Sequence, residues 1–342
     1  MKALVLSGGG ARGAYEAGVA VELLRTHDYD IVCGSSIGAI NAAFVAALRP
    51  DRLAVFWREV LPSRAPILLP HVPRLRHMLA EVGDIGRGSP WANAMRMLHA
   101  ISDVRSLGLF GRRHDAAPNS RLATLARELG ELVDLPSVKR RLLVSATNVT
   151  YGLPATFYAA CDPETFATPD HRAERRSAME WRALGNEFFA WAILASAALP
   201  GLFAPIELAS DFGQCRYADG SLVHNSPIGL AIDAGATDIT VVFVDPIAAV
   251  HGSCPEHDIG RMACAVFILW QQRVLDYELR LVESTNALVR SGALPERKEI
   301  RVRSIRPEYP LAVDVLGFDD FAGIEATYQQ GVRDAQKEPV TL

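Results

Sequence analysis

A predicted strand joins a predicted helix in the stretch Asp30-Ile31-Val32-Cys33-Gly34-Ser35-Ser36-Ile37-Gly38-Ala39-Ile40-Asn41-Ala42-Ala43. A short apolar run breaks into Gly-x-Ser-x-Gly and continues as an alanine-rich helical pattern. A serine on a sharp strand-to-helix turn has a strained backbone, and glycines at 34 and 38 leave room for that turn. Unpaired N–H groups at the helix start would favour a developing anion there. The pattern predicts a nucleophile elbow at Ser36; its alternative is a helix start with a capping serine.

Size and charge exclude several classes of protein. The chain has 342 residues, of which 49% are hydrophobic and 22% are charged, an ordinary globular composition. Enzymes of the α/β class with this length often fold as one unit, so we expect a single domain over 1–342. A net charge of −4 excludes a basic, nucleic-acid-binding domain. We therefore expect no nucleic-acid partner.

Cysteine spacing and the N-terminus bear on the compartment. The five cysteines form no Cys-x-x-Cys pair, which argues against a disulfide framework and a zinc site; they are residues 33, 161, 215, 254 and 264. The apolar run at residues 3–6 is too short for a signal peptide, so we predict a cytoplasmic chain. Residues 188–206 carry no charge, but Pro200, Gly201 and Pro205 would interrupt a membrane-spanning helix. We predict a buried helix at 188–198 instead.

A glycine-rich loop lies between a predicted strand at 2–6 and a predicted helix at 14–25. Gly8, Gly10 and Gly13 match Gly-x-Gly-x-x-Gly, and Asp28 or Asp30 lies where a ribose-binding acid would be sought, which suggests a dinucleotide site. Alternatively, the N–H groups of this loop form an oxyanion hole beside Ser36, with Arg12 adding positive charge. The second interpretation explains more, because a dinucleotide site has no use for a second glycine-flanked turn that exposes a serine.

The remaining chain predicts further α/β units. Residues 51–61 predict a helix containing Trp57, interrupted by prolines from Pro62 onward, and 91–101 predict an amphipathic helix. The region 62–140 is a candidate lid or membrane-touching cap, or else ordinary surface structure. Arg172, Arg175 and Arg176, with Glu174 and Glu180, indicate a solvated helix face. We expect strands at 141–149, 155–159, 239–244 and 299–305, and helices at 228–235, 259–292 and 320–336.

A nucleophilic serine needs a base. In the chain order Ser, Asp, His, an ordinary triad would use Ser36, Asp219 and one of three histidines, His224, His251 or His257. The alternative is a direct pairing of Ser36 with the carboxylate of Asp219, which stands at the turn Asp219-Gly220-Ser221.

Four blocks, in family order, resemble the patatin-like phospholipases. The loop at 8–13 is similar to that family's oxyanion loop, and the stretch 34–38 to its elbow. Residues 195–203, Ala-Ser-Ala-Ala-Leu-Pro-Gly-Leu-Phe, resemble a third block. Asp219-Gly220-Ser221 falls where the family has Asp-Gly-Gly or Asp-Gly-Ala, with Asn225 and Pro227 continuing that block.

The resemblance implies a three-layer α/β/α fold around a mostly parallel sheet, with no cofactor and no metal. It implies catalysis by a Ser36–Asp219 dyad without histidine, and an oxyanion hole from Gly8, Gly9 and Gly10 with Arg12 supporting the loop. Ser221 departs from the family pattern and could add a hydrogen bond near Asp219.

The resulting hypothesis is a calcium-independent lipid acyl hydrolase of phospholipase A or lysophospholipase type, with peripheral membrane contact. Two alternatives stay open: a soluble esterase or thioesterase with a histidine triad, and a lipid-binding protein with weak catalysis or a need for an activating partner.

Overall fold

The computed structural model describes residues 1–68, 121–162, 179–200, 203–210, 213–246, 259–337 and 339–342. The predicted amphipathic helix at 91–101 and most of the predicted cap at 62–140 lie outside these ranges. Three further residues that the sequence singles out also lie outside these ranges: His251, Cys254 and His257.

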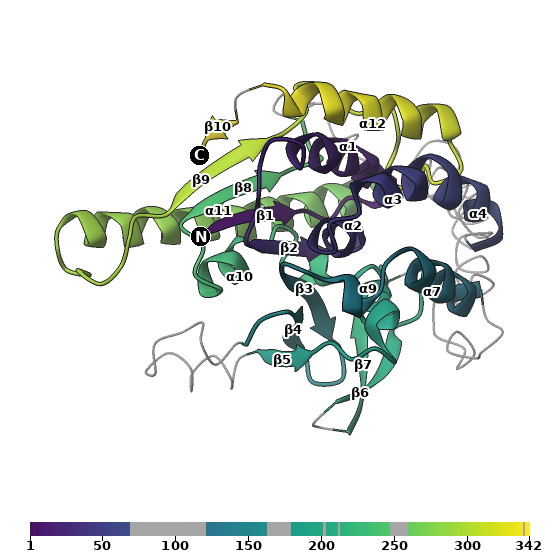
Figure 1. The fold of residues 1–342 in the computed structure, drawn as a ribbon, viewed down its shortest axis with the longest axis horizontal. Coiled ribbons are helices and arrows are strands. Elements are labelled where there is room, and N and C mark those ends of the chain that lie inside the picture. Colours follow the sequence, from purple (N-terminus) through teal and green to yellow (C-terminus); the bar gives the residue numbers. More distant parts are fainter. Residues whose placement is uncertain (69–120, 163–178, 201–202, 211–212, 247–258, 338) are drawn as a thin grey trace, which may run out of the picture.

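One sheet organises the described chain (Figure 1). Its strand order is β10 (Val340–Thr341), β9 (Arg301–Ile305), β8 (Asp238–Val242), β1 (Lys2–Leu6), β2 (Ile31–Ser35), β3 (Arg141–Asn148), β4 (Leu153–Ala159) and β5 (Glu180–Ala183). The strands from β9 to β3 are parallel. A hairpin of β6 (Ile206–Ser210) and β7 (Gly213–Ala218) joins antiparallel through β7 to β3.

The central strands β1 and β2 are apolar on both faces. Leu4, Leu6 and Val32 face one hydrophobic core, while Val5 and Ile31 face the other. All five are almost fully buried. A parallel sheet covered by helices on both sides requires such continuous hydrophobic runs, which is why the strand at 2–6 could be predicted.

Helices cover both faces of the sheet (Figure 1). On one face lie α1 (Gly13–Leu23), α2 (Ile37–Ala46), α3 (Pro50–Val55), α4 (Leu61–Leu68), α7 (Arg121–Leu132), α9 (Phe189–Ser196) and α12 (Phe321–Ala335). On the other lie α10 (Ile228–Asp233) and α11 (Ile259–Arg290). The predicted three-layer α/β/α fold with a mostly parallel sheet is confirmed.

The closing helix α12 packs closely on α1. A Cβ added to Gly18 would meet the carbonyl oxygen of Tyr328, and one added to Gly331 would meet that of Tyr15. The two glycines therefore let the helix backbones approach directly, which fixes α12 beside the N-terminal half of the chain.

Three expectations are corrected. The helix containing Trp57 does not stop before Pro62: a π-helix (Phe56–Val60) follows α3, and α4 continues to Leu68. Glu180 is not on a solvated helix face, because it lies buried in β5, where its carboxylate accepts hydrogen bonds from Asn148 and Tyr217. The buried helix near 188–198 exists but ends at Ser196, four residues before Pro200.

No helix in the described ranges is long and apolar enough to cross a bilayer. The segment around α9 is instead part of the core, since Phe189, Ile193 and Leu194 are buried against the sheet.

Candidate active site

Ser36 lies on the predicted elbow, at the end of β2 and the start of α2. Its backbone has φ 55° and ψ −129°, a left-handed conformation that is strained for a residue with a side chain. A Cβ at Gly34 would meet the carbonyl oxygen of Gly38, and one at Gly38 would meet the carbonyl oxygens of Leu6 and Ser7. Both elbow glycines are therefore required by close backbone approach.

The hydroxyl of Ser36 does not cap its helix. It donates instead to Oδ2 of Asp219 over 2.7 Å, although the two residues are 183 positions apart in sequence. The alternative of a mere capping serine is therefore wrong. The parallel sheet explains the meeting: β2 ends at Ser35, and β7, which pairs with β3 beside it, ends at Ala218.

Asp219 is fully buried and held from several sides. Its Oδ1 accepts the backbone N–H of Ser221 over 2.8 Å. Its own carbonyl oxygen accepts the hydroxyl of Thr147 over 2.8 Å, and its N–H donates to the carbonyl of Ala198. Both carboxylate oxygens therefore have a donor, and the backbone around them is fixed.

Burial raises the pKa of Asp219 from 3.8 to about 6, because the charged form loses its hydration. Hydrogen bonds from Ser36, and from both the amide and the hydroxyl of Ser221, oppose that rise. A carboxylate with this pKa is a stronger base than an ordinary aspartate and is still ionised at neutral pH.

The glycine loop follows β1 and lies against the elbow. Gly8 is so close to Ser36 that an added Cβ would contact the Ser36 Cβ and the Asn225 side chain. Gly10 has φ 60°, which favours glycine. The N–H of Gly8 donates to the carbonyl of Asn225 over 3.0 Å. The N–H groups of Gly9 and Gly10 have no acceptor among the described residues.

Arg12 contacts both this loop and the segment that follows β8. Its Nε donates to the carbonyl of Gly9 over 3.4 Å, and its Nη1 forms an ion pair with Asp245 over 2.8 Å. The ion pair connects the loop to the segment that follows β8.

The dinucleotide interpretation fails on the position of its acids. Asp28 and Asp30 precede β2, at the amino ends of the parallel strands, whereas the glycine loop follows the carboxyl end of β1. Asp30 accepts the N–H of Lys2, and Asp28 pairs with Arg140. A ribose-binding acid would have to lie at the same edge as the loop.

His224 is not placed as the base of a triad. The Asp219 oxygens accept from Ser36 and Ser221, and no hydrogen bond joins His224 to either partner of the dyad. Burial lowers the pKa of His224, with Asp233 the nearby charge that opposes this. The other two candidates, His251 and His257, lie outside the described residues.

Supporting residues around the elbow were not predicted from the sequence. Ser196, at the end of α9, accepts the backbone N–H of Ser36 over 3.0 Å and donates to the carbonyl of Ser145 over 2.6 Å. It belongs to the Ala-Ser-Ala-Ala block, and that block was the one signal that could have identified it. Ser196 is fully buried, and its hydrogen bond holds the backbone of the nucleophile in place.

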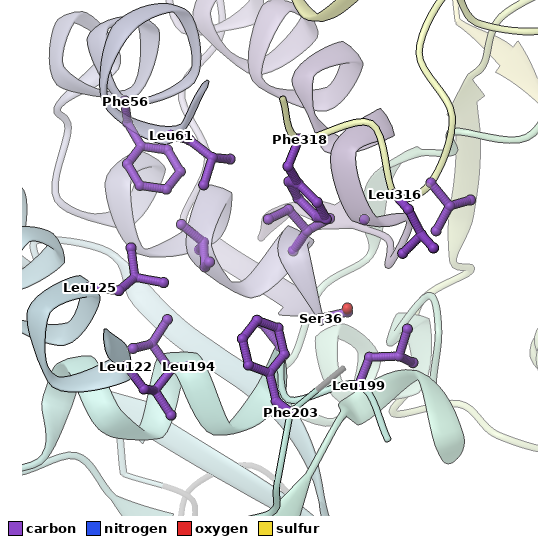
Figure 2. A pocket seen from close by; sticks show the side chains of 15 residues that line it. Ser36, Phe56, Leu61, Leu122, Leu125, Leu194, Leu199, Phe203, Leu316 and Phe318 are labelled. Carbon is purple, nitrogen blue, oxygen red and sulfur yellow. The ribbon is translucent and has the colours of Figure 1, made fainter. Parts of the chain in front are cut away.

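An apolar pocket opens at Ser36 (Figure 2). Its cavity volume is about 80 Å³. Among the described residues that line it, only Ser36 has a polar side chain; the others are Gly10, Ile37, Ile40, Phe56, Leu61, Leu122, Leu125, Leu194, Ala197, Leu199, Phe203, Val315, Leu316 and Phe318. Figure 2 shows Leu125 and Phe56 away from Ser36, across the pocket.

The described residues contain no cluster of three or more His, Cys, Asp or Glu side chains that could hold a metal ion. Cys33, Cys161 and Cys215 are free thiols, and Cys33 and Cys215 are buried.

Ser36, Asp219 and the glycine loop lie within a segment that matches a known protein family. The family model described as Patatin-like phospholipase matches residues 4–232. A curated relative, the "cGAMP-activated phospholipase" of Vibrio cholerae serotype O1, is 26% identical over 250 residues; the match covers 67% of this chain and 57% of the relative. The chain thus spans little more than half the length of that relative.

Solved structures were also matched over the whole chain. VipD from Legionella pneumophila is 14% identical, with a TM-score of 0.38 and 68% of its own chain covered. The SpcU–ExoU complex of Pseudomonas aeruginosa gives 17% identity, a TM-score of 0.30 and 54% coverage of that chain. The family model covers more than half of the chain, including the elbow at Ser36 and the turn at Asp219. This chain therefore belongs to the patatin-like phospholipase family, a family of lipid ester hydrolases.

Proposed function

We propose that this chain hydrolyses carboxylic ester bonds of lipids through a Ser36–Asp219 dyad and an acyl-enzyme. The observation that carries the proposal is the 2.7 Å hydrogen bond from the Ser36 hydroxyl to Asp219 at the mouth of an otherwise apolar pocket. A polar nucleophile facing a hydrophobic cavity suits a substrate with a long hydrocarbon chain and one reactive ester.

The first half-reaction forms the acyl-enzyme. Asp219 takes the proton of the Ser36 hydroxyl as Oγ attacks the acyl carbonyl carbon. The negative charge that develops on the carbonyl oxygen is stabilised by the N–H groups of Gly9 and Gly10, which have no acceptor in the described part of the chain, with Arg12 holding the loop in place. The C–O bond to the alcohol then breaks, and the leaving oxygen receives the proton from Asp219.

The second half-reaction releases the fatty acid. Water attacks the acyl carbon and gives a proton to Asp219, and Ser36 Oγ leaves with that proton. No metal ion takes part, so activity should be independent of calcium. Asp219 can serve as the base because its pKa, raised to about 6, leaves it ionised at neutral pH.

Phospholipase A or lysophospholipase activity is the form of this function that we propose, with peripheral contact to the lipid surface. The relative from Vibrio cholerae is named a cGAMP-activated phospholipase, which supports testing a cyclic dinucleotide as an activator.

The test measures fatty acid release from mixed phospholipid micelles and a fluorogenic acyl ester, with chelator, and with and without cGAMP. Ser36→Ala and Asp219→Asn should abolish release, whereas His224→Ala should retain it. Ser35→Ala is the matched control, because that neighbouring hydroxyl has no hydrogen-bond partner among the described residues. Loss of activity in His224→Ala, or in a variant of His251 or His257, would favour a triad esterase. Vesicle binding without release, unchanged in Ser36→Ala, would favour a lipid-binding protein.

A further inference from the structure

A network of buried polar groups connects the elbow to the glycine loop. The N–H of Ser7 donates to Glu16 Oε1 over 2.5 Å. Asn41 Nδ2 donates to Glu16 Oε2 over 3.1 Å, and the indole Nε1 of Trp57 donates to Asn41 Oδ1 over 2.7 Å. These four residues are at most 1% exposed. Water therefore cannot replace any of these bonds without structural change.

The direction of every hydrogen bond in this network is fixed. An indole N–H only donates, so Asn41 must turn its oxygen to Trp57 and its amide nitrogen to Glu16. The same nitrogen also donates to the carbonyl of Gly13 over 3.0 Å, which excludes the flipped amide. Since the Ser7 N–H also only donates, Glu16 must present an acceptor on both oxygens. Burial raises the pKa of the Glu16 carboxyl, and these donors oppose the rise because they stabilise its charge.

Glu16 thereby connects the glycine loop to the elbow that carries Ser36. Ser7 immediately precedes the glycine loop, and its hydroxyl donates to the carbonyl of Val242. Asn41 lies in α2, the helix that starts directly after Ser36. One carboxylate on α1 thus bonds at one oxygen to the base of the loop and at the other to the helix that carries the nucleophile.

We propose that Glu16 is a positioning residue: its two-acceptor carboxylate fixes the glycine-loop N–H groups relative to Ser36. This inference rests on the proposed function, in which those N–H groups receive the oxyanion. Glutamine has the same shape but one acceptor, so Glu16→Gln must direct an N–H at the N–H of either Ser7 or Asn41. The loop or the helix then has to shift, although no group that touches the substrate has been changed.

The experiment compares wild type with Glu16→Gln and with Glu22→Gln, an isosteric change at a glutamate of the same helix that pairs with Arg25 and Gln336 and contacts neither turn of the site. Active enzyme is counted by stoichiometric labelling of Ser36 with a fluorophosphonate, and kcat and KM are measured per labelled site. Glu16→Gln should lower kcat by about 10- to 100-fold, the cost of a small misplacement in an active site, with KM within about twofold. Glu22→Gln should match wild type. A purely structural role would reduce the number of labelled sites and leave kcat per site unchanged.

A second readout needs no catalysis. The indole N–H of Trp57, assigned through Trp57→Phe, should shift in the ¹H–¹⁵N spectrum of Glu16→Gln and stay in place in Glu22→Gln. A Glu16→Gln enzyme with wild-type kcat per site and an unmoved Trp57 signal would overturn the proposal. If Glu16→Gln does not fold, Asn41→Asp replaces it, since it keeps the acceptor for Trp57 but sets an oxygen against Glu16 Oε2; full kcat per site there would also overturn the proposal. A wild type that neither hydrolyses esters nor reacts with the fluorophosphonate would refute the proposed function, while the spectrum would still test the network.

Discussion

Replacing Asp219 with asparagine should abolish activity and make the protein more stable at alkaline pH. Asp219 is fully buried, and burial raises the pKa of its carboxyl from 3.8 to about 6. Asparagine keeps an oxygen to accept the N–H of Ser221 and gains an N–H that can donate to the Ser36 oxygen, without a charge to bury. The catalytic base would be lost, and so would its desolvation cost.

The magnitude follows from the pKa shift. The folded protein binds the Asp219 proton more tightly than the unfolded chain, so the stability that this group contributes is present below pH 3.8 and is lost as the pH rises through about 6. A shift of about two units corresponds to about 3 kcal/mol. We therefore expect Asp219→Asn to exceed wild type by up to about 3 kcal/mol in free energy of unfolding at pH 8, and to approach it near pH 4.

Equilibrium denaturation of both proteins at pH 4, 5, 6 and 8 measures this difference. Every other titratable group is common to the pair, so the difference isolates position 219. At about 2.1 cal/mol/K per residue, 3 kcal/mol would raise the Tm of a chain of this size by about 4 °C. Asp28→Asn, which changes a largely exposed carboxylate, is the control and should shift stability by less than about 0.5 kcal/mol at each pH. An Asp219→Asn protein no more stable than wild type at pH 8, or a pH-independent difference, would refute the reasoning.

Three further predictions follow from the same site. The value of kcat/KM should rise with pH and reach half its maximum near pH 6, since Asp219 must be ionised to accept the Ser36 proton; a profile flat between pH 5 and 8 would contradict this assignment. Leu125→Trp should obstruct the pocket across from Ser36, and excluding about two methylenes at about 0.8 kcal/mol each should lower kcat/KM for a 16-carbon ester about 15-fold. A four-carbon ester is its control and should be cleaved at the wild-type rate; equal losses on both esters would mean that the acyl chain lies elsewhere. Ser196→Ala leaves the Ser36 N–H and the Ser145 carbonyl without their partner, so thermal or urea unfolding should show a loss of about 1–3 kcal/mol together with a lower kcat. Wild-type stability in that variant would show that neither group depends on Ser196.

The local pattern of the sequence determined the turns and the strands around them. Glycines at 34 and 38 are needed because backbone atoms approach where their side chains would be, and such a steric requirement is visible in the sequence itself. The apolar runs at 2–6 and 31–35 likewise reveal strands buried on both faces, since only a covered parallel sheet accommodates them. The order of four blocks, rather than any single one, indicated the family.

Long-range packing sets which residues lie against those turns, and it is visible only in the tertiary structure. Sequence reasoning left the base open between Asp219 alone and a histidine triad; the pairing of β7 with β3 brings Asp219 within 2.7 Å of Ser36 and leaves His224 unbonded to both. Glu180 looked like a surface residue in sequence, yet its neighbours in space, Asn148 and Tyr217, come from other strands and make it a buried acceptor.

Ser196 and Glu16 could not be assigned roles from the sequence for the same reason. Each acts through hydrogen bonds to residues that only the folded sheet and helices bring near, such as Ser36 for one and Asn41 for the other. Backbone sterics and hydrophobic periodicity are local and can be read along the chain. The partners of a buried polar group are set by long-range packing, and the chain reveals them only when it is folded.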